Sequence, residues 1–202
     1  MGKMKEKNHC RMGVKIHSFL KENNLPLRKL PFVFGNVAPD LTFSYVYCRH
    51  EYTYNSQLLY RLLIRAYRTR SPFLLSYRLG KISHYICDYF CFSHCLAFKG
   101  SLKDHMIYED CQTVNNDDLL PFSSNEIEQI DMEEMISKLE CYIDEREADL
   151  SKDPSLSYMD IPLAIYMATW AASAVAWPAL SENPNPADNI GDCILTVSTT
   201  KT

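Results

Sequence analysis

The sequence predicts an all-α fold, a single-domain bundle of several helices. Apolar residues recur at helical spacing along most of the chain, and no segment alternates apolar and polar residues as a strand does. A chain of 202 residues that is 47% hydrophobic is long enough to bury one sizeable core. We therefore expect one helical domain over residues 1–180. The remaining residues, 181–202, lack a periodic apolar face and are expected to form a flexible tail.

The helical spacing places the expected helices at 9–23, 55–70, 73–93, 102–113, 124–149 and 158–177. Residues 24–53 contain three prolines and a glycine, and they are expected to form an irregular connection. The apolar stretch 161–180 has about the length of a membrane span. It is rich in alanine, contains two prolines and lacks a basic flank, which favours a core helix.

The charge balance argues against a nucleic-acid-binding protein. The formal net charge is -4, so no overall basic field attracts a polyanion. One local cluster, RLLIRAYRTR at 61–70, fits either a solvated helix face or a face that attracts phosphate, and the frequency of arginine on exposed helices favours the solvated face. The N-terminal MGKMKEKNHCRMG is charged and has no apolar segment of the kind found in secretory signals. We therefore expect a cytoplasmic protein whose eight cysteines are free thiols.

Two pairs of metal-binding residue types stand one helical turn apart, His84 with Asp88 and His105 with Glu109. Imidazole and carboxylate at this spacing suit zinc. A single such pair is usually a helix-surface pair or a satisfied buried pair, but two pairs with a further histidine between them favour a metal site. That histidine, His94, would lie about 15 Å from His84 on a continuous helix. Either the helix breaks between them, or His94 binds a different ion beside His105 and Glu109.

A second possible metal site lies in the same segment. The cysteines Cys87, Cys91 and Cys95 recur every four residues and have the chemistry to bind a soft metal. A single helix cannot wrap its sulfur atoms around one ion, and buried free cysteine is common. The packing interpretation is therefore favoured.

The histidine and acid pattern resembles that of the zinc-dependent phospholipases C, relatives of the P1-type nucleases that have an all-helical fold around three zinc ions. The family pattern is His-x-x-x-Asp, then a His six residues after that Asp, then His-x-x-x-Glu. The residues that match this order are His84, Asp88, His94, His105 and Glu109.

The resemblance extends upstream, to a histidine of the family's N-terminal helix and to an aspartate and a histidine of its loops. The corresponding residues here are His9, Asp40 in GNVAPDL and His50 in CRHEY. By this resemblance, Asp40 would be the carboxylate beside the metal-bound water and hence the general base. The implied zinc ligands form three sets: His50, His84 and Asp88; then His9, sharing a bridging Asp88; and finally His94, His105 and Glu109.

One departure from the family concerns the N-terminus. Secreted members use the amino group and carbonyl of an N-terminal tryptophan as zinc ligands, whereas this sequence starts with Met1. We therefore expect two or three zinc ions. His17 lies eight residues after His9 and could complete that site, but its apolar neighbours favour a core histidine.

The resemblance implies a zinc-dependent phosphoester hydrolase, with phospholipase C-like cleavage of a phosphodiester by a metal-activated water. A phosphoester or phospholipid substrate would follow, together with transient contact with a membrane surface. The family's headgroup pocket is not recognisable, because Leu41 follows Asp40 where an aromatic residue is expected. The alternatives are a phosphomonoesterase or nuclease on the same cluster and a non-catalytic metal-binding protein. The acidic balance argues mildly against the nuclease.

Overall fold

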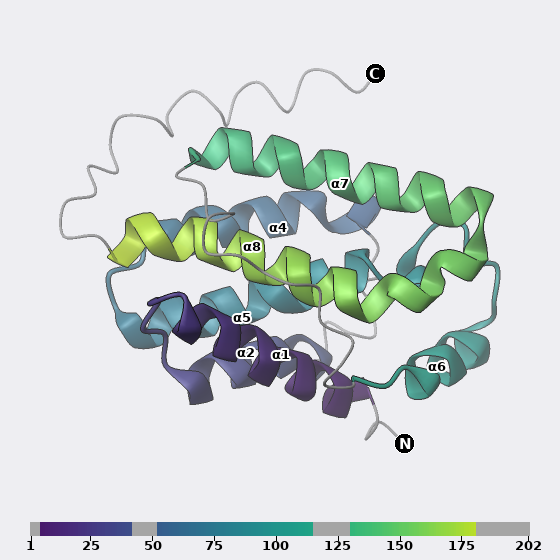
Figure 1. Ribbon diagram of the computed structural model, residues 1–202, viewed down its shortest axis with the longest axis horizontal. Coiled ribbons are helices and arrows are strands. Elements are labelled where there is room, and N and C mark those ends of the chain that lie inside the picture. Colours follow the sequence, from purple (N-terminus) through teal and green to yellow (C-terminus); the bar gives the residue numbers. More distant parts are fainter. Residues whose placement is uncertain (1–4, 42–51, 115–129, 181–202) are drawn as a thin grey trace.

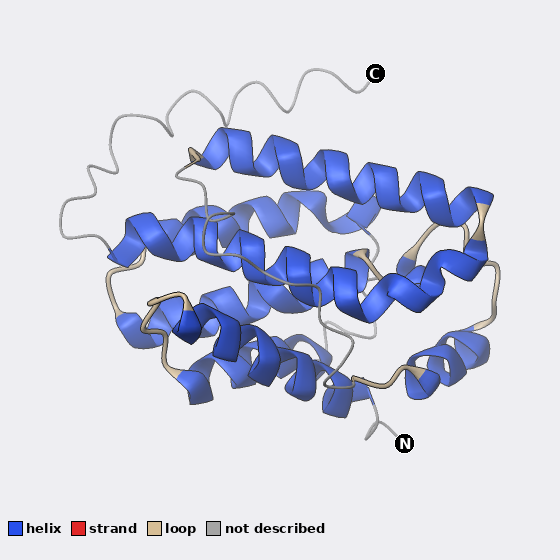
Figure 2. Ribbon diagram, viewed as in Figure 1, coloured by secondary structure: helices blue, strands red, loops and turns tan. Residues whose placement is uncertain are grey.

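A computed structural model of the chain describes residues 5–41, 52–114 and 130–180. Every regular element among these residues is a helix, which confirms the all-α prediction (Figure 2). The α-helices are α1 (Lys5–Glu22), α2 (Lys29–Leu41), α4 (Tyr52–Tyr67), α5 (Pro72–Tyr89), α6 (Leu102–Cys111), α7 (Met132–Lys152) and α8 (Asp160–Leu180). Two short 3-10 helices, η1 (Phe92–His94) and η3 (Pro154–Met159), connect them. The expected tail at 181–202 and His50 lie outside the described residues.

Helices α5 and α8 form the centre of the bundle, with α1 and α2 on one side and α4 and α7 on the other (Figure 1). By length and composition alone, the segment 154–180 could cross a membrane, but 67% of its most apolar window is buried inside the protein. This burial agrees with the core-helix interpretation. Because α5 and α8 are in contact and both are largely buried, polar side chains at the end of α5 are enclosed by protein.

Local sequence signals account for where several helices begin. Ser71 caps α5 by accepting a hydrogen bond from the Leu74 backbone N–H, and Pro72 fits the first helical position. Ser101 and Asp104 form a reciprocal capping box at the start of α6. These caps fix the entry points of the two helices that carry the paired histidine and acid residues.

Helix α2 corrects the expectation that residues 24–53 are irregular throughout. Pro31 lies in the first turn, where a backbone N–H has no intrahelical partner, so its missing N–H costs nothing. Pro39 lies in the last turn, so its effect is confined to the helix end. Asp40 therefore belongs to the end of a helix rather than to a loop. Residues 42–51 are outside the described part of the chain.

Helices α2 and α5 approach each other closely at two glycines. A Cβ atom added at Gly35 would overlap the carbonyl oxygen of Tyr77, and one added at Gly80 would overlap the carbonyl oxygen of Phe32. Only glycine permits this backbone contact. It sets the end of α2, with Asp40, beside the end of α5.

The end of α5 differs from the expected helix over 73–93. The helix stops at Tyr89, Phe90 is its C-cap, and Cys91 adopts an extended conformation before η1 begins. The chain therefore turns between His84 and His94, as one of the two alternatives from the sequence required. Helix α7 begins at Met132 rather than at 124, and residues 115–129 are outside the described residues.

Candidate metal centre

Three helices each contribute one side chain to a first group of possible ligands. His9 of α1, Asp40 of α2 and His84 of α5 have ligand atoms within 4.8 Å of one another. Asp40 Oδ2 lies 3.9 Å from His9 Nε2, and Asp40 Oδ1 lies 3.7 Å from His84 Nε2. His9 is 4% exposed and His84 is fully buried, so the group lies inside the protein.

A second group lies where η1 meets α6. His94, His105 and Glu109 have ligand atoms within 4.8 Å of one another. Glu109 Oε1 is 2.9 Å from Nε2 of both histidines. The break after α5 turns His94 towards His105 and Glu109, the two neighbours that the other alternative gave it. That these three residues bind an ion of their own stays a prediction.

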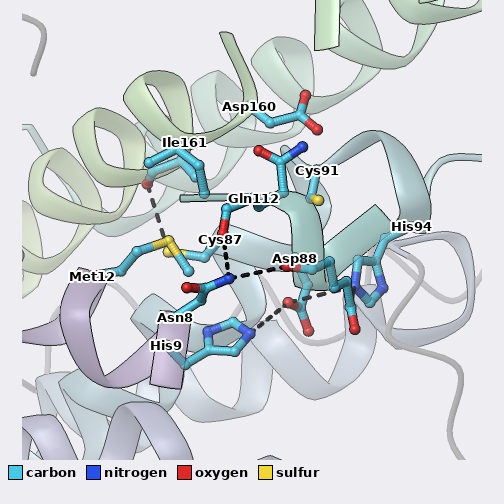
Figure 3. A pocket seen from close by; sticks show the side chains of 12 residues that line it. Asn8, His9, Met12, Cys87, Asp88, Cys91, His94, Gln112, Asp160 and Ile161 are labelled. Atoms are coloured by element: carbon cyan, nitrogen blue, oxygen red, sulfur yellow. Dashed lines mark hydrogen bonds and ion pairs between the residues drawn. The ribbon is translucent and has the colours of Figure 1, made fainter. Parts of the chain in front are cut away.

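Asp88 joins the two groups into one cluster. Its Oδ1 lies 3.1 Å from His9 Nε2 and 3.6 Å from His94 Nε2, while its Oδ2 lies 3.3 Å from His84 Nε2. Figure 3 shows His9 and His94 on either side of this carboxylate. Asp88 is only 2% exposed, so water contributes little to neutralising its charge.

Hydrogen bonds to the other ring nitrogens orient two of the histidines. His84 Nδ1 lies 2.9 Å from the backbone carbonyl of Asn36, and His105 Nδ1 lies 3.0 Å from that of Ser93. A carbonyl oxygen can only accept, so each Nδ1 is the donor. In a neutral imidazole, Nε2 then presents its lone pair to the carboxylates, and a cation bound between the two acceptors would satisfy both.

The geometry and donor types of the cluster fit zinc. Zinc binds imidazole and carboxylate at about 2.0–2.2 Å, so two ligands of one tetrahedral ion lie about 3.3 Å apart. The distances from the Asp88 and Glu109 oxygens to the imidazole nitrogens, from 2.9 to 3.6 Å, bracket that value. Backbone carbonyls that orient two of the histidines are also present, as is usual in zinc sites.

The first helix is tied directly to the second ligand group. The Asn8 side-chain amide donates to the carbonyls of Glu109 and Gln112, over 3.0 and 2.8 Å. Both carbonyls lie at the end of α6, where intrahelical partners are missing. Asn8 therefore fixes the spacing between its neighbour His9 and Glu109.

Asp160, which the sequence analysis did not identify, fixes the second group from the opposite side. Its fully buried carboxylate accepts hydrogen bonds from the Phe92 backbone N–H over 2.8 Å, from Tyr108 Oη over 2.5 Å and from Arg146 Nη2 over 2.6 Å. Burial, assisted by this hydrogen bond, raises the pKa of Tyr108 well above its ordinary value, so the phenol stays a donor. Asp160 lies 52 residues from Tyr108 and 68 from Phe92, and no sequence spacing indicated these contacts.

A small cavity opens beside Asp88, next to the start of α8. Its volume is about 30 Å³, enough for a water molecule or two. Figure 3 shows the lining side chains, which come from α1, α5, η1 and the residue before it, the end of α6 and the start of α8. Four of the lining residues, His9, Asp88, His94 and Glu109, belong to the cluster itself.

The remaining sequence candidates lie outside these ligand groups. His17 Nε2 is 2.9 Å from the Leu27 carbonyl in the core, in agreement with the core-histidine interpretation. None of the described cysteines joins either group. Cys87 donates to the Ala164 carbonyl over 3.8 Å, and burial raises the pKa of Cys87 and Cys91, as packed neutral thiols require.

Some assignments implied by the family resemblance stay predictions. The structure sets His9, His84 and Asp40 together in one group, whereas the resemblance assigned His9 and His84 to different zinc ions and Asp40 to the general base. His50 lies outside the described residues, so its assignment as a ligand also stays a prediction.

Two adjoining groups of largely buried imidazole and carboxylate donors define an all-α protein with a candidate site for metal ions. A model of the zinc-dependent phospholipase C family matches residues 8–169, and the chain belongs to this family. The match begins one residue before His9 and ends within α8, so it includes both ligand groups and Asp160. Membership of this family identifies zinc as the metal and phosphoester hydrolysis as the general activity. No curated protein and no solved structure matches the chain.

Proposed function

We propose that this protein is a phospholipase C-like hydrolase that cleaves the phosphodiester bond of a phospholipid. The products would be diacylglycerol and a phosphorylated headgroup. The observation that carries the proposal is the position of Asp88, whose carboxylate is 3.1 to 3.6 Å from three imidazoles. A carboxylate shared in this way favours two adjacent cation positions, the arrangement used for in-line displacement at phosphorus.

Zinc ions bound there would neutralise phosphate oxygens and lower the pKa of water towards 7. The protein would supply the base. Asp40 Oδ1 and Oδ2 are 3.7 and 3.9 Å from the nearest imidazole nitrogens, and each Asp88 contact with an imidazole is shorter. This greater separation suits a carboxylate that accepts a proton from water more than one that binds the cation directly.

The proposed reaction consumes one water molecule. Its oxygen forms the new bond to phosphorus while Asp40 takes one of its protons. The bond between phosphorus and the glycerol oxygen breaks, and that oxygen leaves with a proton from solvent. The cavity beside Asp88 and His94 has room for a water molecule next to the cluster.

The test is a substrate comparison with the zinc-loaded protein. The substrates are phosphatidylcholine in mixed micelles, a mononucleotide, a single-stranded oligonucleotide and a chromogenic phosphodiester. The proposal expects release of diacylglycerol. Turnover of the mononucleotide or oligonucleotide without release of diacylglycerol would make the protein a phosphomonoesterase or nuclease. No turnover of any substrate at full zinc content would make it a metal-binding protein.

A further inference from the structure

The described helices separate the charges of the protein. Residues 23–41 and 52–87 contain one acidic residue, Asp40, which belongs to the buried cluster. Their basic residues are Arg28, Lys29, Arg61, Arg65, Arg68, Arg70, Arg78 and Lys81. Helix α7, which lies at the edge of the bundle away from α2, carries seven acidic and three basic residues (Figure 1). The net charge of -4 therefore conceals an excess of positive charge on α2, α4 and α5.

Two of these positively charged helices, α2 and α5, also carry exposed apolar side chains. On α2, Leu30 is 83% exposed and Phe34 is 59% exposed, while on α5 Phe73 is 55% exposed and Leu74 is 45% exposed. Monomeric soluble proteins rarely expose several large apolar side chains close together, and clusters of this kind mark interaction sites.

The apolar residues of the two helices form one surface. Leu30 and Phe34 are one helical turn apart, and so are Phe73 and Tyr77. The rings of Phe34 and Tyr77 stack with centroids 5.9 Å apart, which joins the two rows. We call the surface formed by Leu30, Phe34, Phe73, Leu74 and Tyr77 the α2–α5 face.

Basic residues flank the α2–α5 face in the sequence and in the fold. Arg28 and Lys29 directly precede Leu30, and Arg68 and Arg70 lie in the turn that leads into Phe73; all four are exposed. Arg78 Nη1 donates to the Arg65 carbonyl and to Thr69 Oγ1, which fixes α5 against the end of α4. An apolar centre with a basic border is typical of surfaces that bind anionic membranes.

The end of α2 that carries Asp40 also carries an exposed apolar residue. Leu41 is 58% exposed and stands seven residues after Phe34, so it lies on the same helix face. It directly follows Asp40. The distance along the helix from Leu30 to Leu41 is about 16 Å. If α2 lay along a membrane surface, the end of the helix that carries Asp40 would be at that surface too.

We infer that the α2–α5 face docks on a bilayer of anionic phospholipid, with α2 lying in the plane of the headgroups. This docking deepens the proposed function, because it names the surface through which the cluster meets a lipid substrate. The solvated-face interpretation of residues 61–70 accounts for the arginines but not for Leu30, Phe34 and Phe73. Nucleic-acid binding would also use the positive charge, but it does not account for exposed aliphatic residues such as Leu30.

Vesicle sedimentation tests the docking without relying on hydrolysis. The full-length, zinc-loaded protein is mixed in the cold with vesicles of phosphatidylcholine, alone or partly replaced by phosphatidylglycerol. We expect binding to the anionic vesicles, weaker at high salt. The double variants Phe34→Ser/Phe73→Ser and Arg68→Glu/Arg70→Glu should each weaken binding about tenfold or more. Their side chains are exposed, so circular dichroism and melting should match wild type.

Matched controls come from α6 and α7, two helices that do not contribute to the α2–α5 face. Leu102→Ser removes a 72% exposed apolar side chain from α6, and Lys138→Glu reverses a charge on α7. Both should leave vesicle binding unchanged. Wild-type binding by the Phe34→Ser/Phe73→Ser variant would overturn the inference. Equal binding to an oligonucleotide, with loss only in the arginine variant, would do the same and indicate a general polyanion surface.

A different result would contradict the proposed function. All variants should hydrolyse the soluble chromogenic phosphodiester at the wild-type rate, because none of the altered residues belongs to the cluster. Vesicle binding without release of diacylglycerol would leave the docking intact and contradict only the phospholipase activity.

Discussion

Gly35 of α2 and Gly80 of α5 face each other, and a Cβ atom added at Gly35 would lie 3.2 Å from the Gly80 Cα. This contact does more than pack two helices. One residue beyond Gly35, the Asn36 carbonyl accepts the hydrogen bond of His84 Nδ1. One turn further, Asp40 reaches His84 Nε2 at 3.7 Å. Close backbone packing and the orientation of His84, a predicted zinc ligand, therefore depend on the same pair of glycines.

The first prediction is that Gly80→Ala destabilises the protein, although alanine is the better helix former by about 1 kcal/mol. The added methyl group would overlap the Phe32 carbonyl oxygen, which is backbone and cannot rotate away. We expect a net loss of about 1–3 kcal/mol in the free energy of unfolding, measured by urea denaturation. Gly13→Ala is the matched control, because its methyl group would meet the Asn36 side chain at 3.1 Å and should cost less. Equal stability of wild type and Gly80→Ala would contradict the prediction.

The second prediction concerns zinc content. The cluster has two ligand groups joined by Asp88, so protein purified without chelator should contain at least two zinc ions per chain. Replacing His105 with Asn removes one imidazole from the second group and should lower the content by about one ion. Elemental analysis of both proteins checks this. Less than one zinc ion per wild-type chain would contradict the prediction.

The third prediction is that removing zinc loosens the domain. Without a cation, the His84 Nε2 lone pair faces the carboxylates of Asp40 and Asp88 in a buried site. Ligand present at about 1,000 times its Kd stabilises a protein by about 4 kcal/mol, and each kcal/mol shifts Tm by about 2–4 °C at this size. A chelator should therefore lower Tm by about 10 °C, and added zinc should restore it. An unchanged Tm after verified loss of metal would show that the cluster does not support the fold.

The sequence was sufficient for the fold class and for the family. The two histidine and acid pairs stand at helical spacing, and His94 follows Asp88 after six residues. These are intervals along the chain, so they can be recognised without knowing how the helices pack. Helix α2 was missed because its prolines were read as breakers. Pro31 lies in the first turn, which tolerates a missing N–H, and Pro39 lies in the last turn, where its effect is confined to the helix end. Asp160 was missed for a different reason: Phe92 and Tyr108 are remote from it in sequence, and only the folding of the chain brings them to the start of α8.

The fourth prediction concerns Asp160. Asp160→Asn leaves the Arg146 guanidinium buried beside a neutral amide, and breaking a buried ion pair costs about 3–5 kcal/mol. Because Asp160 also holds the Phe92 N–H and Tyr108, the second ligand group should lose zinc affinity more than the first. Zinc titration with a competing chelator measures both affinities, and urea denaturation measures the stability.

Asp153→Asn is the control for Asp160→Asn, since Asp153 is an exposed cap at the start of η3, and asparagine caps nearly as well. It should retain wild-type stability and zinc affinity. If Asp160→Asn binds zinc as tightly as wild type at both positions, Asp160 supports the fold without positioning the ligands.

The last prediction is that Asp40 acts on the substrate water as the general base. Its side chain is 3% exposed and lies between His9 and His84, at longer distances than the contacts of Asp88. Asparagine has nearly the same shape but cannot accept a proton at neutral pH, so Asp40→Asn should keep the fold and zinc content. The hydrolytic rate should fall by about 10²–10⁴, the usual contribution of a positioned base.

Zinc analysis and turnover of the Asp40→Asn protein together separate three roles for this residue. Full zinc content with a large loss of kcat supports the base. Loss of zinc would make Asp40 a ligand of the His9 and His84 group instead, and added zinc should then partly restore the rate. Near wild-type turnover at full zinc content would assign Asp40 a structural role at the end of α2, because an amide in the same position can form hydrogen bonds but cannot take the proton of the attacking water.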